Sequence, residues 1–385
     1  MAKKQIAVMD IGSSKIRVIV LSPKNKKNFE VMGVGESAYA GYRSGEFLEP
    51  DKLKKALEEA LTNAQNSASF LVKELYVGVP ADFLVIKTKQ LSSSFAIRRK
   101  VREQDTFDLM DRGNDLKFNK DYTLIAVNAI SYKLDNGRFV MSPENNKTQT
   151  LSAHLSYEYG NNECIRKLNA CFEEIGLASV DYVSAPLAEF LYLLDEHARK
   201  DHALIVDSGY SNTHVLIGKN KGLVSLHSFA LGGGHMTADL AKIIHIDFEQ
   251  AEKLKRKAIL VSDQAKGGYE VTVKGEPFEV PAAIVSDIIK DRIDLIAKGI
   301  EKAIELSGVD YPKYLPVFLT GGGFSLIKGA KEYLTKQLDR PIEILAPKVP
   351  QFNKPQSSSL ISLAHFATEK EYTTSHSFLA KLLGK

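Results

Sequence analysis

Residues 6–21 have the sequence Ile6-Ala-Val-Met-Asp10-Ile-Gly12-Ser13-Ser14-Lys15-Ile-Arg-Val-Ile-Val-Leu21, and residues 203–218 have the sequence Ala203-Leu-Ile-Val-Asp207-Ser-Gly209-Tyr210-Ser211-Asn212-Thr213-His-Val-Leu-Ile-Gly218. In each segment an apolar run ends in an aspartate, a glycine follows two residues later, small polar residues come next, and a second apolar run returns. This pattern predicts a β-hairpin with a carboxylate at its base. Its repetition predicts two related lobes with a ligand between them.

The tips of both hairpins have the composition of a phosphate site. Glycine lets a ligand approach the backbone, and successive N–H groups form an anion-binding nest. We expect phosphate to be held by Gly12, Ser13, Ser14, Lys15, Gly209, Tyr210, Ser211, Asn212 and Thr213. We expect Asp10 and Asp207 to organise Mg²⁺ through water, because magnesium dehydrates reluctantly. A single hairpin of this kind would more often be purely structural.

A third segment strengthens the prediction. It is Val317-Phe-Leu-Thr320-Gly321-Gly322-Gly323-Phe324-Ser325-Leu-Ile-Lys-Gly329, in which an apolar strand ends in three glycines that lead into a helical pattern. Bare backbone at this point allows a base or a ribose to lie flat against the chain. We therefore expect Gly321, Gly322, Gly323 and Ser325 to hold a nucleoside. In this order and at this spacing, the three segments resemble the phosphate-one, phosphate-two and adenosine motifs of the actin, Hsp70 and sugar kinase superfamily.

Composition sets limits on the class of protein. The 385 residues are 44% hydrophobic and 25% charged, which is ordinary for a soluble globular protein, and they are enough for two or more domains. A formal net charge of +4 gives no general footprint for nucleic acid. We find no apolar secretory segment and no run near the roughly 18 apolar residues of a membrane span. We therefore expect a cytoplasmic protein without a nucleic-acid partner.

The order of elements predicts an α/β protein with two related lobes and an inserted subdomain. A helical stripe from Asp51 and a strand at Leu75–Pro80 follow the first hairpin, and strand-like segments then break this rhythm. We expect a first lobe in residues 1–82 and 161–202, an inserted subdomain in 83–160, a second lobe in 203–231 and 309–370 with an outer subdomain in 232–308, and a linker and amphipathic tail in 371–385.

Further segments narrow the resemblance to FtsA, the actin-like bacterial cell-division protein. They are Tyr42-Arg-Ser-Gly45-Glu-Phe-Leu-Glu, Ala185-Pro186-Leu187-Ala188, and Gly232-Gly233 through Ala251-Glu252-x-Leu254-Lys255. The similarity extends over nearly the whole chain, and the insert lies where the FtsA-specific subdomain is expected. By this resemblance Gly233 belongs to the nucleotide site, and Glu252 and Lys255 border the adenosine. Without the motif, a solvated helix face would be the better interpretation of those two charges.

Two departures from the hydrolytic pattern bear on mechanism. The second tip has fewer glycines than the fuller form of its motif, and His214 stands where that form often has an acid. Ala185 stands where many actin-like ATPases carry Glu or Gln, and a methyl group cannot orient the attacking water. We therefore expect ATP to act as a conformational ligand that bridges the lobes, with slow or no hydrolysis.

The C-terminal tail has the pattern of a short cationic amphipathic helix. We expect the preceding helix to end near Lys370, Ser377 to cap the tail helix, and the membrane-facing residues to be Phe378, Leu379, Lys381, Leu382 and Leu383. FtsA proteins end similarly, with a linker and a membrane-targeting helix. The alternatives are a frayed terminus and a tail docked on its own domain.

These observations favour an FtsA-like protein that binds ATP with Mg²⁺, polymerises into actin-like protofilaments and tethers FtsZ, among other division proteins, to the cytoplasmic face of the membrane at the division site. One alternative is a related actin-like adaptor such as the pilus-assembly protein PilM. Another is a small-molecule kinase of the same superfamily. We find no dedicated catalytic carboxylate for a substrate hydroxyl, which counts against this alternative.

Overall fold

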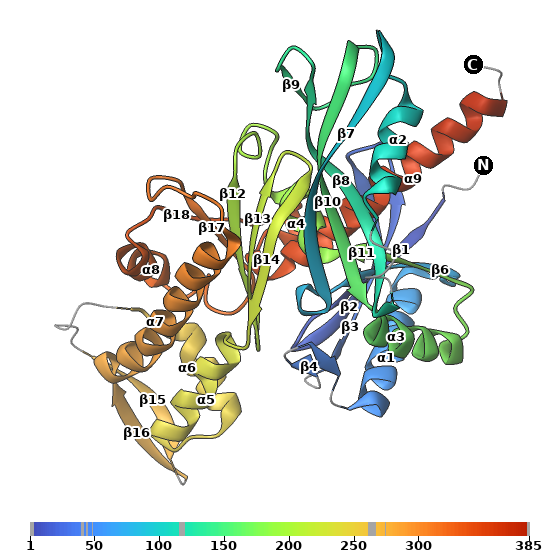
Figure 1. Ribbon diagram of the computed structural model, residues 1–385. Helices are drawn as coiled ribbons and strands as arrows, with labels where there is room; N and C mark the ends of the chain where they lie inside the picture. The colour runs from blue at the N-terminus through green and yellow to red at the C-terminus, as the bar shows by residue number, and fades with distance from the viewer. Residues whose placement is uncertain are drawn as a thin grey trace.

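The computed structural model describes residues 4–39, 42–43, 45–47, 49–114, 120–260, 267–273 and 275–382, with side chains for all of these except 42–43 and 374–382. The molecule has two lobes side by side, with an inserted sheet at the junction between them (Figure 1). Among the described residues, no helix is long and apolar enough to cross a membrane.

The first lobe is built on a five-stranded sheet with the order β11-β6-β1-β2-β3. Its strands are β1 (Ile6–Ile11), β2 (Lys15–Pro23), β3 (Phe29–Ala38), β6 (Glu74–Val79) and β11 (Ser179–Ser184). Successive side chains of β1 point to opposite faces of this sheet, so the strand contributes to two cores. Ala7 and Met9 join one core with helices α1 (Pro50–Ala68) and α3 (Asn162–Ile175), whereas Val8 joins another with α4 (Ala185–Leu193) and α9 (Ser358–Leu382).

The second lobe repeats this connectivity. Its sheet has the order β14-β13-β12-β17-β18, which matches the first sheet strand for strand when read as β3-β2-β1-β6-β11. The strands are β12 (Ala203–Ser208), β13 (Thr213–Lys219), β14 (Gly222–Phe229), β17 (Val317–Thr320) and β18 (Ile342–Ile344). The hairpins also agree in register, because Asp10 lies opposite Arg17 and Asp207 lies opposite His214. The predicted duplication is therefore present in both sheets.

The helices of the second lobe cover one face of its sheet. They are α5 (Gly233–Ile244), α6 (Phe248–Lys257), α7 (Ala282–Ser307) and α8 (Ala330–Leu338), and the small hairpin β15 (Gly268–Val273) and β16 (Glu276–Pro281) lies beyond them. The long helix α7 buries one apolar stripe and ends at Gly308, which adopts a left-handed conformation. The stripe is formed by Ile289, Ile293, Ile296, Ile300 and Ile304.

Helix α4 (Ala185–Leu193) connects the lobes and packs against both of them. Ala185 and Ala188 belong to a core of the first lobe, whereas Leu187 and Phe190 belong to a core of the second. The helix begins with Pro186 in its first turn, and the Ser184 hydroxyl accepts a hydrogen bond from the Leu187 N–H. A helix enclosed on two sides holds any polar side chain that it carries away from water.

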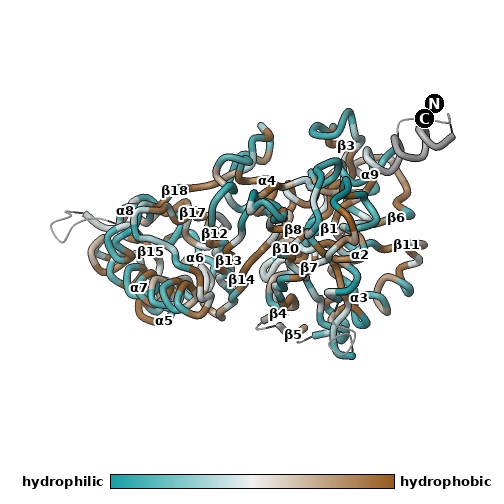
Figure 2. The backbone as a smooth tube through the Cα atoms, turned by 45° about the horizontal axis from the view of Figure 1, so that its top comes forward, coloured by the Kyte–Doolittle hydropathy of each residue, from teal (hydrophilic) through white to brown (hydrophobic). Residues whose placement is uncertain are grey.

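The inserted segment forms its own antiparallel sheet and core. It consists of β7 (Leu84–Lys100), α2 (Glu103–Arg112), β8 (Tyr122–Leu134), β9 (Phe139–Val140) and β10 (Lys147–Asn161). The views in Figures 1 and 2 both place β7 and β10 beside β14 of the second lobe, and residues of these strands are in contact.

The C-terminal helix differs from the prediction in two ways. Helix α9 (Ser358–Leu382) neither ends near Lys370 nor restarts at Ser377, because residues 371–377 contain no glycine or proline that would end a helix. The helix also packs on the first sheet, although we expected residues up to 370 to complete the second lobe. Glu371 fixes it there by accepting hydrogen bonds from Lys4 Nζ and the Tyr76 hydroxyl, both at 2.6 Å. Leu383 lies outside the described residues.

Candidate functional site

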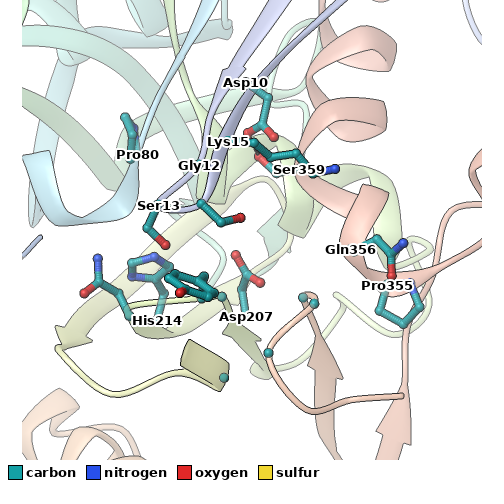
Figure 3. Close-up of a pocket in the computed structure, with 18 of the residues that line it drawn as sticks. Asp10, Gly12, Ser13, Lys15, Pro80, Asp207, His214, Pro355, Gln356 and Ser359 are labelled. Carbon is teal, nitrogen blue, oxygen red and sulfur yellow. Dashed lines mark hydrogen bonds between the residues drawn. The ribbon is translucent and has the colours of Figure 1, made fainter. Parts of the chain in front are cut away.

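A cavity of about 600 Å³ lies between the lobes, where the two hairpin tips, the glycine loop after β17 and the starts of α5 and α9 meet (Figure 3). Its volume is in the range of small-molecule sites. The predicted residues in its lining are Asp10, Gly12, Ser13, Ser14, Lys15, Asp207, Gly209, Tyr210, Asn212, Gly233, Glu252, Lys255, Gly321, Gly322 and Gly323. Segments that are far apart in sequence therefore converge on one cavity, as the motifs predicted.

Three predicted residues lie behind the cavity wall. The Ser211 N–H donates to Ser13 Oγ at 3.1 Å, and the buried Thr213 hydroxyl donates to the Leu231 carbonyl at 2.7 Å. The Ser325 hydroxyl donates to the Gly321 carbonyl within the glycine loop. These residues hold the shape of the loops and do not line the cavity.

The first hairpin tip is closed by its own backbone. The Gly12 N–H donates to the Lys15 carbonyl at 3.1 Å, which turns the chain within four residues. Within the part of the chain that the structure describes, the N–H groups of Ser13 and Ser14 have no hydrogen-bond partner. Two adjacent N–H donors and the Lys15 side chain at the rim are groups that bind phosphate oxygens.

The second tip is held by contacts between backbones. The N–H groups of Gly233 and Gly234 donate to the carbonyls of Gly209 and Tyr210, at 3.0 and 2.7 Å. A Cβ added to Gly233 would meet the Gly323 carbonyl oxygen at 2.3 Å, and one added to Gly323 would meet the Gly209 carbonyl oxygen at 2.5 Å. The glycines are required because three loops touch without side chains between them.

Lys255 and Glu252 lie at the wall and not on a solvated helix face. The Lys255 side chain is 4% exposed, and its Nζ donates to the Gly233 carbonyl at 2.9 Å and to Glu252 Oε2 at 2.7 Å. Burial lowers the pKa of Lys255, and the ion pair with Glu252 opposes this effect. The Thr237 hydroxyl also donates to Glu252, which fixes the pair between α5 and α6.

Asp10 has partners on both carboxylate oxygens. Arg17 Nη2 donates to Oδ2 at 2.6 Å, and the Ser359 hydroxyl donates to Oδ1 at 2.6 Å. Arg17 also donates to the Gln356 carbonyl at 2.6 Å, so the first hairpin is tied to the start of α9. In Figure 3, Ser359 and Gln356 enter the site beside Asp10 from the C-terminal part of the chain.

Glu189 is a carboxylate at the cavity that the sequence analysis missed. It lies on α4 in the cavity lining, is 3% exposed, and its Oε1 has no hydrogen-bond partner among the described residues. Burial, together with the nearby Asp207 and Asp10, raises its pKa well above the ordinary value. Burial also raises the pKa of Asp207, and His214 and Arg17 oppose that rise. The sequence did contain a signal for Glu189, because it is a single acidic residue in an otherwise apolar helix.

Direct contacts between the lobes close one side of the cavity. Besides the bond from Ser211 to Ser13, Asp82 of the first lobe accepts a hydrogen bond from Asn212 Nδ2 at 3.2 Å. His214 Nε2 lies 3.4 Å from the same Asp82 carboxylate. The second hairpin therefore contacts the first lobe through polar groups that water or a ligand can replace.

Comparisons with known proteins confirm the resemblance to FtsA. The family model "Cell division protein FtsA" matches residues 204–367. FtsA of Streptococcus pneumoniae is 23% identical over 93% of this chain and 79% of its own length. FtsA of Neisseria meningitidis is 23% identical over 96% of this chain and 91% of its own length. FtsA of Bacillus subtilis is 22% identical over 93% of this chain and 82% of its own length.

Solved structures show that the fold is the actin-like ATPase fold. The PilM–PilN type IV pilus biogenesis complex has a chain with a TM-score of 0.64 at 14% identity, which covers 95% of this chain and 99% of that chain. MreB5 of Spiroplasma citri bound to AMPPNP has a TM-score of 0.55 at 12% identity, and the match covers 97% of this chain and 99% of that chain. At these identities the likeness concerns the fold alone.

Proposed function

We propose that this chain is an actin-like cell-division protein that binds ATP between its lobes, polymerises into protofilaments and tethers FtsZ to the cytoplasmic face of the cell membrane. The observation that carries the proposal is the convergence of both hairpin tips, the glycine loop and the pair Glu252–Lys255 on one cavity. The similarity to proteins named FtsA over most of the chain supports the assignment to cell division.

The nucleotide would enter with its phosphates between the two tips. The N–H groups of Ser13 and Ser14, which have no partner among the described residues, and the Lys15 ammonium supply donors on the first-lobe side. The adenosine would lie against Gly321–Gly323, beside Glu252 and Lys255. Phosphate between the tips would replace the bond from Ser211 to Ser13, so that the ligand connects the lobes. Mg²⁺ at Asp10 and Asp207 is not part of this proposal, because both Asp10 oxygens already have protein partners.

Lys15→Ala tests the site with little risk to the fold. Among the described residues, the ion-pair partner of Lys15 Nζ is the exposed Glu36 at 2.8 Å, and exposed pairs contribute about 0–1 kcal/mol to stability. Loss of a charged donor to phosphate should weaken ATP binding about tenfold. The control is Lys24→Ala, which removes a similar exposed pair with Glu30 outside the cavity lining. Equal affinities of the two variants for a fluorescent ATP analogue would contradict the proposed site.

Polymerisation and membrane contact follow from the same proposal. A tail that binds lipid weakly gains avidity when a filament presents many copies. We propose that the C-terminal part of α9, with Phe378, Leu379, Lys381 and Leu382, and the following Leu383 form this contact. The wild type with ATP should then sediment with anionic liposomes, and the double variant Leu382→Glu with Leu383→Glu should not. Liposome binding by the double variant at the wild-type level would exclude the tail as the anchor.

The division assignment has its own test against the PilM alternative. The PilM likeness is a likeness of fold at 14% identity, so it does not favour a pilus partner for this chain. In a bacterial two-hybrid experiment with FtsZ and PilN as baits, we expect a signal with FtsZ. A signal with PilN alone would replace the division assignment by the adaptor alternative.

A further inference from the structure

Arg17 occupies the base of the cavity, where the sequence analysis expected a divalent cation. It lies on β2 directly opposite Asp10 of β1, so its position is fixed by the register of the hairpin. Its side chain is 15% exposed and lines the cavity. The residue is therefore placed by the same hairpin that presents the tip to the ligand.

The contacts of Arg17 leave part of its donor capacity unused. Nη2 donates to Asp10 Oδ2 and Nη1 donates to the Gln356 carbonyl, each at 2.6 Å. The Nε atom is buried and has no hydrogen-bond partner within the described ranges. A guanidinium has five N–H donors in a fixed plane, and the buried Nε–H is out of reach of a ligand. The two bonds hold the group while the second N–H of Nη1 and of Nη2 remains for a ligand.

The surrounding groups do not fit Mg²⁺. Asp10 has Arg17 on one oxygen and Ser359 on the other, and the ion pair with Arg17 already neutralises the Asp10 charge that a cation would need. Mg²⁺ also requires near-ideal octahedral oxygen ligands. In the described part of the chain, no group of three or more His, Cys, Asp or Glu residues is arranged to hold a metal ion. The Asp10 carboxylate, which we expected to organise Mg²⁺ through water, is held by Arg17 and Ser359 in this structure.

We propose that the guanidinium of Arg17 takes the place of the divalent cation in this cleft, so that the nucleotide binds without Mg²⁺. The inference rests on the proposed function, because it concerns the same ligand in the same cavity. The guanidinium is covalently part of the hairpin and, unlike a bound metal ion, does not exchange with solvent. Arg17 neutralises Asp10 and presents its remaining donors toward phosphate oxygens, with Lys15 at the rim as a second cation.

The test compares nucleotide affinity with Mg²⁺ and with EDTA. The full chain is titrated with a fluorescent ATP analogue in each buffer, and we expect affinities that agree within about threefold. Binding that is lost in EDTA but present with Mg²⁺ would overturn the inference and leave ATP binding intact. Absence of binding in both buffers would overturn the inference and the proposed function together.

Arg17→Gln tests whether Arg17 is the residue that makes nucleotide binding independent of Mg²⁺. Without the guanidinium, Asp10 is free to take part in cation binding, so we expect the affinity in EDTA to fall at least about tenfold and Mg²⁺ to restore part of it. Unchanged affinity in EDTA would overturn the assignment to Arg17. Arg17→Lys is the second variant in case the Gln variant is unstable. It keeps the charge and should bind nucleotide independently of Mg²⁺. Mg²⁺-dependent binding by Arg17→Lys would contradict the inference.

The matched control is Arg99→Gln. Arg99 forms a similar ion pair, with two bonds of 2.7 Å to Asp105, but it lies in the inserted subdomain, outside the cavity lining. Its loss should leave nucleotide affinity unchanged in both buffers. A change equal to that of Arg17→Gln would show a general effect on stability and would overturn the assignment.

Discussion

The two hairpins share a backbone and a register, yet different contacts hold them in place. In the first hairpin, side chains do this: Asp10 binds Arg17 and Ser359, and Arg17 reaches the start of α9. In the second hairpin, backbones also touch directly, with Gly233 and Gly323 packed against the tip, in addition to the contacts of Asn212 and His214 with Asp82. The comparison teaches that one duplicated motif can be fixed either by replaceable side chains or by contacts that tolerate no side chain.

Gly321→Ala should have the largest effect, because it breaks the backbone packing of the second hairpin. Gly321 has φ +86°, and an added Cβ would meet the Ser208 carbonyl oxygen and Asp207 Oδ1, each at 2.3 Å. We expect a loss of about 4 kcal/mol or more in the free energy of unfolding, measured by urea denaturation.

The control for this change is Gly137→Ala. Gly137 has a similar φ of +80°, but nothing lies within 4 Å of an added Cβ. This variant should lose only about 1–2 kcal/mol, which is the cost of the left-handed conformation alone. Similar losses for both variants would show that the close backbone contacts do not matter.

Glu158→Gln tests how much a buried carboxylate lowers the free energy of unfolding when neither a cation nor backbone donors bind it. Glu158 is fully buried in β10, and burial raises its pKa to about 8, an effect that the Ser184 hydroxyl partly opposes. The folded state then keeps a proton that the unfolded state, with a pKa near 4.5, has lost, so stability falls as the pH rises from 4.5 to 8.

Gln cannot ionise, so the variant should lack this fall. Relative to wild type, we expect a gain of about 3 kcal/mol at pH 8 and little change at pH 5, from urea unfolding at both pH values. A gain that is the same at both values would contradict the raised pKa. Asp10, which has Arg17, provides the contrast of a supported carboxylate.

Ser359→Ala weakens the side-chain support of the first hairpin. Its hydroxyl donates to the nearly buried Asp10 carboxylate at 2.6 Å, and a hydrogen bond to a charged group contributes about 1.5–3 kcal/mol. We expect a loss near the lower end of this range by thermal or urea denaturation.

The comparison at the second hairpin is Ser228→Ala. Ser228 Oγ lies 2.9 Å from His214 Nδ1, in an exposed position. This change should alter the free energy of unfolding by no more than about 0.5 kcal/mol. If it equalled the Ser359 change, the proposed difference between the hairpins would be refuted.

Ser13→Ala should have the smallest effect on stability. It removes the acceptor of the Ser211 N–H, which is one bond between the tips, so we expect a loss of less than about 1 kcal/mol. The sensitive measurement is hydrogen exchange of the Ser211 amide, which should become faster because the lobes separate more often. Ser14→Ala on the same tip is the control and should leave this exchange unchanged.

The sequence by itself determined the local elements and their repetition. The hairpins, the α7 stripe ending at Gly308, the polar helix α2 and the glycine loop follow from patterns of a few to about 25 neighbouring residues. The hairpin tips and the glycine loop converge because each follows the end of a strand and these strand ends meet at the cleft. Short-range periodicity and glycine placement contain this information.

Only the tertiary structure decided which charges meet at the base of the cavity. Asp10 and Ser359 are 349 positions apart, and no local pattern shows that α9 returns to the first lobe. Glu189 becomes a buried carboxylate because α4 is enclosed by both lobes. Arg17 is adjacent in register to Asp10, yet its significance depends on the Gln356 carbonyl that holds it in place. Electrostatic roles depend on burial and on distant partners, and packing of the whole chain sets both.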